Sequence, residues 1–236
     1  MILEIWWVPT AMLEHLNRLE ELRGPTKREA DFLADVKRVK QWQHRRLRYT
    51  YHDLSIDHRF APATAFFFDE LYGEKDTVQR DRDLLRMYPT IKRLLPKFAF
   101  ETLDNALALD VLSEEFDQAL AAQTRGVAIN NAVYCEAFRA VGRKADRLRQ
   151  VALMQEVGHG LDLVVKKPLI YSTLKMLRRP SKLAGLAEMQ QFLEAGFSAF
   201  RHMKGATPFL HAIAERETAL IEAIFLRGIP TLPPEK

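Results

Sequence analysis

Segments with clear helical starts and stops follow one another along most of this chain, and they constrain its fold more than any other feature. The last segment has Thr207 as its N-cap, Pro208 at the first helical position and Gly228 after the last turn. Its apolar residues recur at helical spacing on one face: Phe209, Leu210, Ile213, Leu220, Ile221, Ile224 and Phe225. The chain has no alternating strand pattern and no Asn-Gly hairpin, so the fold is predicted to be all-α.

The same signals divide the chain into nine or ten helices. Thr26 to Glu29 form a capping box that begins a long helix, and Pro89 and Pro96 are expected to break the chain. An irregular polar stretch is expected over 53–61. The predicted helices cover residues 10–23, 26–51, 63–72, 77–87, 97–123, 131–141, 144–166, 169–178, 182–203 and 208–227.

Length and composition bound the organisation of the chain. With 236 residues, of which 47% are hydrophobic and 28% charged, it can bury a full core and is neither disordered nor a disulfide scaffold. We predict one all-α domain over 1–236. Residues 1–9 form an apolar N-terminal arm, expected to pack on the core, and 229–236 an extended Pro-rich tail.

Cysteine usage and hydropathy favour a cytoplasmic protein. The single cysteine, Cys135, cannot form an internal disulfide and is expected to be a buried apolar side chain. The apolar start of the chain lacks the basic region and cleavage site of a secretory signal, and no window is long enough for a transmembrane segment. The net charge of +4 is too small by itself to demand nucleic acid.

A rare motif occupies residues 66–73, which read Phe-Phe-Phe-Asp-Glu-Leu-Tyr-Gly. Together with Trp42-Gln43, 50–54, 59–63 and 196–206, it resembles the bacterial family named for its FFLEELY motif, over about residues 38–226. Phe68 replaces Leu and Asp69 replaces Glu. The resemblance implies a bacterial origin and adds no chemistry, because that family has no established activity.

The three phenylalanines of this motif surround their helix. A helix that is apolar on every side is buried, so Phe66, Phe67 and Phe68 predict the central core helix. The alternative is a pocket beside this helix for an apolar ligand or haem.

Motifs of catalysis and metal binding are missing from the sequence. There is no Gly-rich phosphate loop, G-x-S-x-G, H-E-x-x-H or C-x-x-C. Asp104, Asp110, Glu114 and Asp117 are interpreted as spread around one helix, so they predict no paired acid–base site. We therefore predict no catalytic residue and favour a non-catalytic function.

Glu156-x-x-His159 is half of a di-iron motif, and no second pair occurs. Gly158 and Gly160 would let a flat haem approach, but His159 lies in line with polar residues and is expected in solvent, as are His202 and His211. No metal site and no cofactor are predicted.

The strongest charge feature is a basic helix face over 37–48. Lys37, Lys40, His44, Arg45 and Arg48 lie on or beside this face, and Trp42 at its edge would be able to stack on a base. The simpler interpretation is a solvated face beside an acidic neighbour, so nucleic acid is not the favoured partner.

Gln43 interrupts the apolar face that Val39 and Leu47 belong to. A buried amide costs roughly 1–3 kcal/mol unless it is hydrogen-bonded, so Gln43 is expected to have polar partners. The stretch after this helix offers Asp53, Asp57 and Arg59. With Tyr72, the residues Gln43, Asp53 and Arg59 are the candidates for a buried structural network or for a ligand pocket.

Three classes of function remain open from the sequence. The favoured one is a helical interaction or regulatory protein, with a protein partner or a second copy of the chain. The alternatives are a protein or enzyme that binds a small molecule, and a nucleic-acid binder. A pocket with converging polar groups would favour the small-molecule class.

Overall fold

The computed structural model describes residues 10–24, 30–71, 78–176, 178–228 and 230–234. These residues form helices and connecting loops and contain no strand. The prediction of an all-α fold with about ten helices is confirmed. The predicted single domain over 1–236 stays a prediction.

The helices follow one another with short connections. Their bounds are α1 (Thr10–Arg23), α2 (Ala30–Thr50), α3 (His52–Ile56), α4 (Ala61–Phe66), the π-helix η2 (Phe67–Leu71), α5 (Val78–Leu94), α6 (Lys97–Gln123), α7 (Asn131–Val141), α8 (Lys144–Val165), α9 (Pro168–Met176), α10 (Arg178–Leu183), α11 (Ala187–Met203) and α12 (Thr207–Phe225).

Helices with strong end signals begin and end where the sequence predicts. α7 is the clearest case, because the Asn130 side chain accepts a hydrogen bond of 2.8 Å from the backbone N–H of Val133. Gly142 follows the helix with a φ of 68°, a conformation that glycine adopts without strain. Local capping therefore sets both ends of this helix.

Three predicted boundaries are wrong. The stretch expected to be irregular contains α3, and Pro89 lies inside α5 because that helix packs on α1 on both sides of the proline. The helix expected over 182–203 is two helices, separated at Gly185, whose φ is +74°. The predicted capping box over 26–29 and the arm over 1–9 lie outside the described residues.

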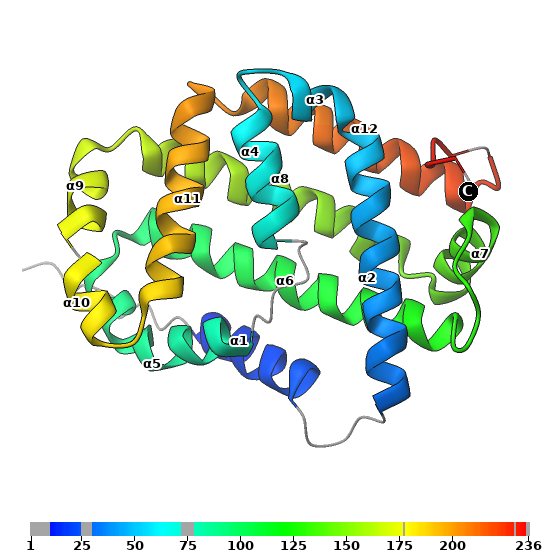
Figure 1. Cartoon of the computed structure of the whole chain (residues 1–236), viewed down its shortest axis with the longest axis horizontal. Helices are drawn as coiled ribbons and strands as arrows, with labels where there is room; N and C mark the ends of the chain where they lie inside the picture. Colours follow the sequence, from blue (N-terminus) through cyan, green and yellow to red (C-terminus); the bar gives the residue numbers. More distant parts are fainter. Residues whose placement is uncertain (1–9, 25–29, 72–77, 177, 229, 235–236) are drawn as a thin grey trace, which may run out of the picture.

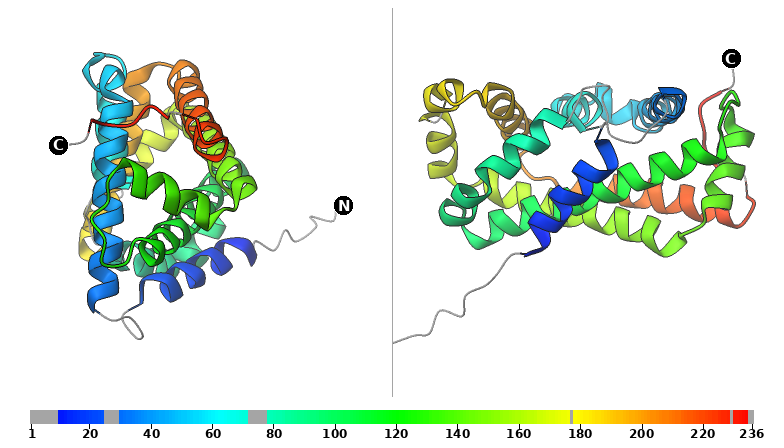
Figure 2. Two further views of the ribbon diagram at one scale, coloured as in Figure 1. Left: turned by 90° about the vertical axis from the view of Figure 1, so that its right-hand side faces the viewer. Right: turned by 90° about the horizontal axis from the view of Figure 1, so that it is seen from below.

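The helices form two layers that cross each other. α6, α8 and α12 lie side by side in one layer, and α2, α4 and α11 run across them in the other (Figures 1 and 2). α6 occupies the middle, with α8, α1, α2 and α7 packed around it. The central helix is therefore α6, which corrects the prediction that the helix of Phe66 to Phe68 is central.

The three phenylalanines instead lie at the end of α4 and the start of η2. Phe66 is buried against Gly196 of α11, where a side chain at position 196 would collide with its ring. Phe68 is buried and Phe67 is partly exposed, and both belong to the π-helix η2. A π-helix widens the backbone turn and is frequent near functional sites.

Buried apolar residues form two clusters. The smaller one joins α1, α5, α6 and α11, and the larger one lies among α2, α4, α6, α7, α8, α11 and α12. Cys135 belongs to the larger cluster and is buried, as predicted. None of the helices that the structure describes combines the length and the hydropathy that a membrane span requires.

Candidate ligand-binding site

A cavity of about 50 Å³ lies inside the larger cluster, between the two layers. Its apolar wall includes Phe116, Phe138, Val151, Met154 and Ile213. Polar and charged side chains also converge on it from six elements. They are Gln43, Arg46, Tyr51, Thr64, Ser113, Asp117, Tyr134, Arg147, Gln150 and Glu217. A polar cavity in the core of a helical protein is the feature that most needs a functional explanation.

The first charged group at the cavity is an ion pair between α2 and α12. Arg46 donates through Nη1 to Oε1 of Glu217, and the Tyr51 hydroxyl donates to the same oxygen at 2.7 Å. Burial alone would lower the pKa of Arg46, but the neighbouring Glu217 carboxylate raises that pKa above its ordinary value. Arg46 therefore keeps its charge, although its Nε–H has no hydrogen-bond partner.

The second charged group is Asp117 of α6. Its Oδ1 accepts a hydrogen bond from Nε2 of Gln43, and its Oδ2 lies 4.0 Å from Nζ of Lys40. Burial raises the pKa of Asp117 to about 7, against the opposing effect of Lys40. Near neutral pH this carboxyl group is therefore divided between its charged and neutral forms.

The third charged group, Arg147 of α8, has surroundings of a different kind. Only 4% of its surface is exposed, and its guanidinium carbon lies 3.5 Å from the ring centroid of Phe116 and 4.1 Å from that of Phe138. Neither Nε nor Nη2 has a hydrogen-bond partner, and among the described residues the Asp117 carboxylate acts on this side chain through space without forming an ion pair with it. Burial lowers the pKa of Arg147 to about 10, so the group is still a cation at neutral pH.

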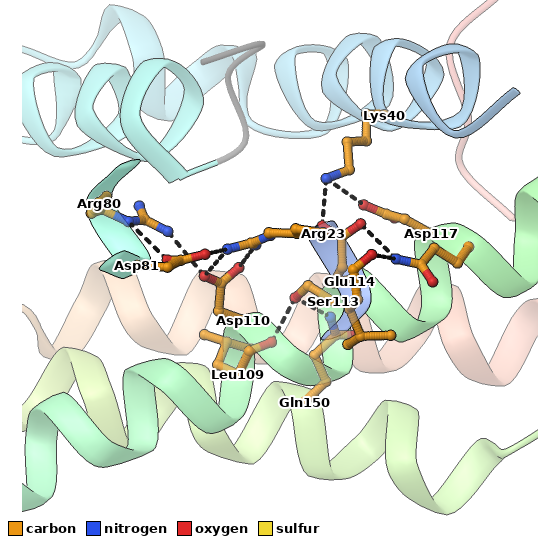
Figure 3. Close-up of polar contacts among 12 residues, drawn as sticks. Arg23, Lys40, Arg80, Asp81, Leu109, Asp110, Ser113, Glu114, Asp117 and Gln150 are labelled. Carbon is orange, nitrogen blue, oxygen red and sulfur yellow. Dashed lines mark hydrogen bonds and ion pairs between the residues drawn. The ribbon is translucent and has the colours of Figure 1, made fainter. Parts of the chain in front are cut away.

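A separate set of ion pairs surrounds Arg23 at the end of α1. Its guanidinium donates to Asp81 at 2.7 Å, to Asp110 at 2.5 Å and to Glu114 at 3.2 Å, and Arg80 also donates to Asp110 at 2.9 Å (Figure 3). We call Arg23, Asp81, Asp110 and Glu114 the Arg23 cluster. Burial alone would lower the pKa of Arg23, but its three carboxylates raise it.

Lys40 connects this cluster to the cavity. Its ammonium group lies 2.7 Å from Oε2 of Glu114 and 4.0 Å from Asp117 (Figure 3). Burial alone would raise the pKa of Glu114, but Lys40 and Arg23 lower it to about 2. Asp110, Glu114 and Asp117 therefore follow one face of α6, so the expectation that the carboxylates of this helix are spread around it is wrong for these three.

The cavity comes nearest to solvent between α6 and α8. All its lining residues are buried except Phe67, Ser113 and Gln150, which are partly exposed. Gln150 donates to the Ser113 hydroxyl at 2.8 Å, and Ser113 donates to the Leu109 carbonyl at 2.8 Å (Figure 3). These two hydrogen-bonded polar side chains therefore lie between the cavity and solvent.

Comparison with protein-family models places this site in a family. The model described as Domain of unknown function (DUF8198) matches residues 22–228, which include every residue that lines the cavity. The chain belongs to this family. No curated protein and no solved structure matches the chain. The resemblance to FFLEELY-motif proteins and the bacterial origin stay predictions.

Of the four pocket candidates, the structure brings only Gln43 to the cavity. Asp53 forms an ion pair with Arg216 at 2.6 Å on the surface, and Arg59 donates to the backbone carbonyls of Met203 and Gly205 at 2.7 and 3.0 Å. The expected network of Gln43 with Asp53, Asp57 and Arg59 is thus wrong, because Gln43 points toward α6 and α3 turns those residues outward. Tyr72 lies outside the described residues.

The predicted basic face of α2 is divided by the fold. Lys37, Arg45 and Arg48 are exposed, whereas Lys40 and His44 are partly buried. Lys40 turns inward to Glu114, and the His44 ring lies edge-on to Phe68. Trp42 is buried and stacks on Tyr134 at 3.7 Å between ring centroids, so it is not at the edge of this face as expected. The exposed Lys37, Arg45 and Arg48 therefore do not have Trp42 beside them as a surface on which a base would stack.

Three histidines of α8, α11 and α12 face solvent, and the two glycines of α8 serve helix packing. His159, His202 and His211 are exposed, as predicted. Side chains at Gly158 and Gly160 would collide with Leu210 of α12 and Thr102 of α6, so these glycines let α8 pack closely on both neighbours rather than admit haem. The described residues contain no group of three side chains arranged to hold a metal ion.

Sequence reasoning missed Arg46, Arg147 and Glu217, although the signal that singled out Gln43 applies to them as well. Arg46 lies seven residues after the buried Val39, and Glu217 lies four residues after Ile213. Arg147 lies four residues before Val151. Each is a charged residue on an apolar helical face. Other charged residues beside them in the sequence make these three look like part of a solvent-exposed surface.

Proposed function

We propose that this protein binds a small molecule in the cavity between its two helical layers. The observation that carries the proposal is the convergence of two cations, two carboxyl groups and several uncharged polar groups on one cavity inside the core. Ligand sites combine an apolar wall with a few converging polar groups, and this cavity has both.

A purely structural network explains the site less well. Buried polar groups in folded proteins are nearly all hydrogen-bonded, and burial of an unpaired one costs about 1–3 kcal/mol. Here Nε of Arg46 and both Nε and Nη2 of Arg147 have no partner. Several unpaired donors at one cavity are what a binding site without its ligand would present.

Mass spectrometry tests the proposal without assuming the chemistry of the ligand. Purified protein, measured under native conditions, should carry a bound mass, and extraction after denaturation should release the same molecule. Val151→Phe places a ring at the cavity wall and should abolish the bound mass.

The matched control is Val157→Phe, on the same helix at a partly exposed position outside the cavity, and it should retain the bound mass. A wild-type protein that carries no small molecule, and whose melting temperature no member of a metabolite library changes, would contradict the proposal.

A second candidate, self-association, has a specific observation in its favour. Leu169, Met176 and Leu183 are strongly exposed on the adjacent helices α9 and α10. Apolar side chains in water favour a second copy of the chain as the partner. Light scattering after gel filtration should then give twice the chain mass, falling to the monomer in Leu169→Glu/Leu183→Glu. A monomer at every concentration would exclude this candidate.

A cytoplasmic location in a bacterium and a non-catalytic role complete the proposal. The reasons are the single cysteine, the resemblance at residues 66–73 and the missing catalytic motifs of the sequence. Nucleic-acid binding through Lys37, Arg45 and Arg48 is not favoured, since Lys40 is directed to Glu114 and Trp42 to Tyr134.

A further inference from the structure

Arg147 differs from the other charged groups at the cavity. Arg46 has Glu217 as its partner, and Asp117 has Gln43 and Lys40. Arg147 is equally buried, but its neighbours are the rings of Phe116 and Phe138 and it has no carboxylate partner among the described residues. Asp117 lines the same cavity and attracts Arg147 electrostatically, but it forms no ion pair or hydrogen bond with the guanidinium. A buried cation without a directly bound anion is costly, and an anion from outside the chain would remove that cost.

The two unpaired nitrogens define the shape of that anion. Nε–H and one N–H of Nη2 lie parallel on the same edge of a guanidinium group, and this fork matches the two oxygens of a carboxylate. The guanidinium carbon lies over the rings of Phe116 and Phe138, which accept no strong hydrogen bond from its N–H groups. A planar anion that approaches in the guanidinium plane satisfies both donors at once.

The size and wall of the cavity restrict the rest of the molecule. A volume of about 50 Å³ accommodates roughly four water-sized groups, at about 10–15 Å³ for each. Val151, Met154 and Ile213 offer an apolar surface for a short hydrocarbon chain. A phosphate dianion would bring two negative charges to the one unpaired cation, whereas a monocarboxylate brings one.

We infer that the ligand of the cavity is a small monocarboxylate, whose two oxygens accept hydrogen bonds from Nε and Nη2 of Arg147. The inference rests on the proposed function and names the chemical class of its ligand. Arg147 lies in the first turn of α8, where the helix dipole adds to the positive potential that attracts the anion. Ser113 and Gln150 are the partly exposed polar residues of the lining, so the anion would enter beside them.

Calorimetric titration at constant ionic strength tests the inference, with formate, acetate, propionate and butyrate as probes. At least one carboxylate should bind the wild-type protein, and its neutral amide should bind at least tenfold more weakly. Arg147→Lys keeps the charge but lacks the fork, so it should weaken carboxylate binding about tenfold or more. Arg149→Lys, on the exposed side of the same helix, should leave the affinity within about twofold.

A wild-type measurement covers the case in which the Arg147 variant does not fold. Addition of the carboxylate should shift the NMR signal of a protected arginine Nε–H, because that proton gains a charged acceptor. An unchanged set of arginine Nε–H signals at saturating carboxylate would overturn the inference.

Other outcomes separate the inference from the proposed function. Inorganic phosphate binding more tightly than every carboxylate, or a neutral molecule in the denatured extract, overturns the carboxylate assignment and leaves a small-molecule site. No binding of any carboxylate, with no bound mass in the native protein, overturns both.

Discussion

Arg23 and Arg147 are both largely buried, but their surroundings differ. Arg23 donates to three carboxylates, and its pKa is raised. Arg147 contacts two aromatic rings and no carboxylate, and its pKa is lowered to about 10. The chain supplies carboxylate partners for the Arg23 guanidinium, whereas Nε and Nη2 of Arg147 have no hydrogen-bond partner. Burial alone therefore does not distinguish the two arginines, whereas their hydrogen-bond partners do.

The largest effect is expected from Arg23→Met. This change leaves Asp81, Asp110 and Glu114 without their shared cation, and loss of one member of a buried ion-pair set costs about 3–5 kcal/mol. Urea unfolding should show that loss in the free energy of unfolding. Arg18→Met, at an exposed position of the same helix, should change it by less than about 1 kcal/mol. A similar decrease in the free energy of unfolding in both variants would contradict a structural role for the Arg23 cluster.

Gln43→Ala comes next, because it removes the hydrogen-bond donor to Asp117. An unpaired buried acceptor should lower the free energy of unfolding by about 1–3 kcal/mol. Arg45→Ala, exposed on the same helix, is the comparison and should stay within about 0.5 kcal/mol of wild type. If Gln43→Ala were equally mild, the polar side of the cavity would be solvated rather than buried.

The pH dependence of stability tests the charge state of the cavity. Asp117 has a pKa raised from 3.8 to about 7 in the folded state, so the folded state binds this proton more tightly than the unfolded state. Its contribution to stability is present below about pH 4 and is lost as pH rises through about 7. Asp117→Asn removes this loss, so from pH 5 to pH 7 the variant should gain about 2 kcal/mol relative to wild type.

Urea unfolding of both proteins at several pH values measures that gain. Glu101→Gln, an exposed carboxylate on the same helix, should run parallel to wild type across this range. A difference between Asp117→Asn and wild type that does not vary with pH would show that Asp117 titrates like an ordinary surface carboxyl group.

The smallest effect on stability is expected from Arg147→Met. The loss of ring contacts with Phe116 and Phe138 is offset by removal of an unpaired buried cation, so the free energy of unfolding should change by less than about 1 kcal/mol. Thermal unfolding of Arg23→Met and Arg147→Met side by side makes the comparison direct. A loss as large as that of Arg23→Met would mean that Arg147 is structural as well.

The fold could be predicted where the signals are local. Asn130 and Gly142 mark the ends of α7, and the apolar stripe of α12 is visible in the sequence. Pro89 misled the prediction because tertiary packing on α1 tolerates a proline that an isolated helix would not. The central helix is α6 rather than the helix of the phenylalanine motif. Which helix is central depends on the packing of the other helices around it, and the sequence of one helix does not show that packing.

The site could be predicted only in part, for a related reason. Gln43 could be identified because its neighbours on that face, Val39 and Leu47, are apolar, whereas Arg46 lies within a basic run. Which partner such a residue meets depends on the crossing of the layers, and the nearest polar stretch in sequence, with Asp53 and Arg59, is turned to the surface. The face of a helix on which a residue lies can be read from the local sequence, whereas its hydrogen-bond partner depends on how the helices pack.

The interval between Arg147 and Gly158 of α8 is a sequence feature that can be sought in other members of the family. Gly158 seats α8 on α12, and Arg147 precedes it by eleven residues, which is close to three full helical turns. An insertion or deletion of one residue between them would rotate Arg147 by about 100° around the helix axis, away from the rings of Phe116 and Phe138. Members that keep the ligand should therefore keep an arginine eleven positions before a glycine, and members that vary this interval should have lost the arginine as well.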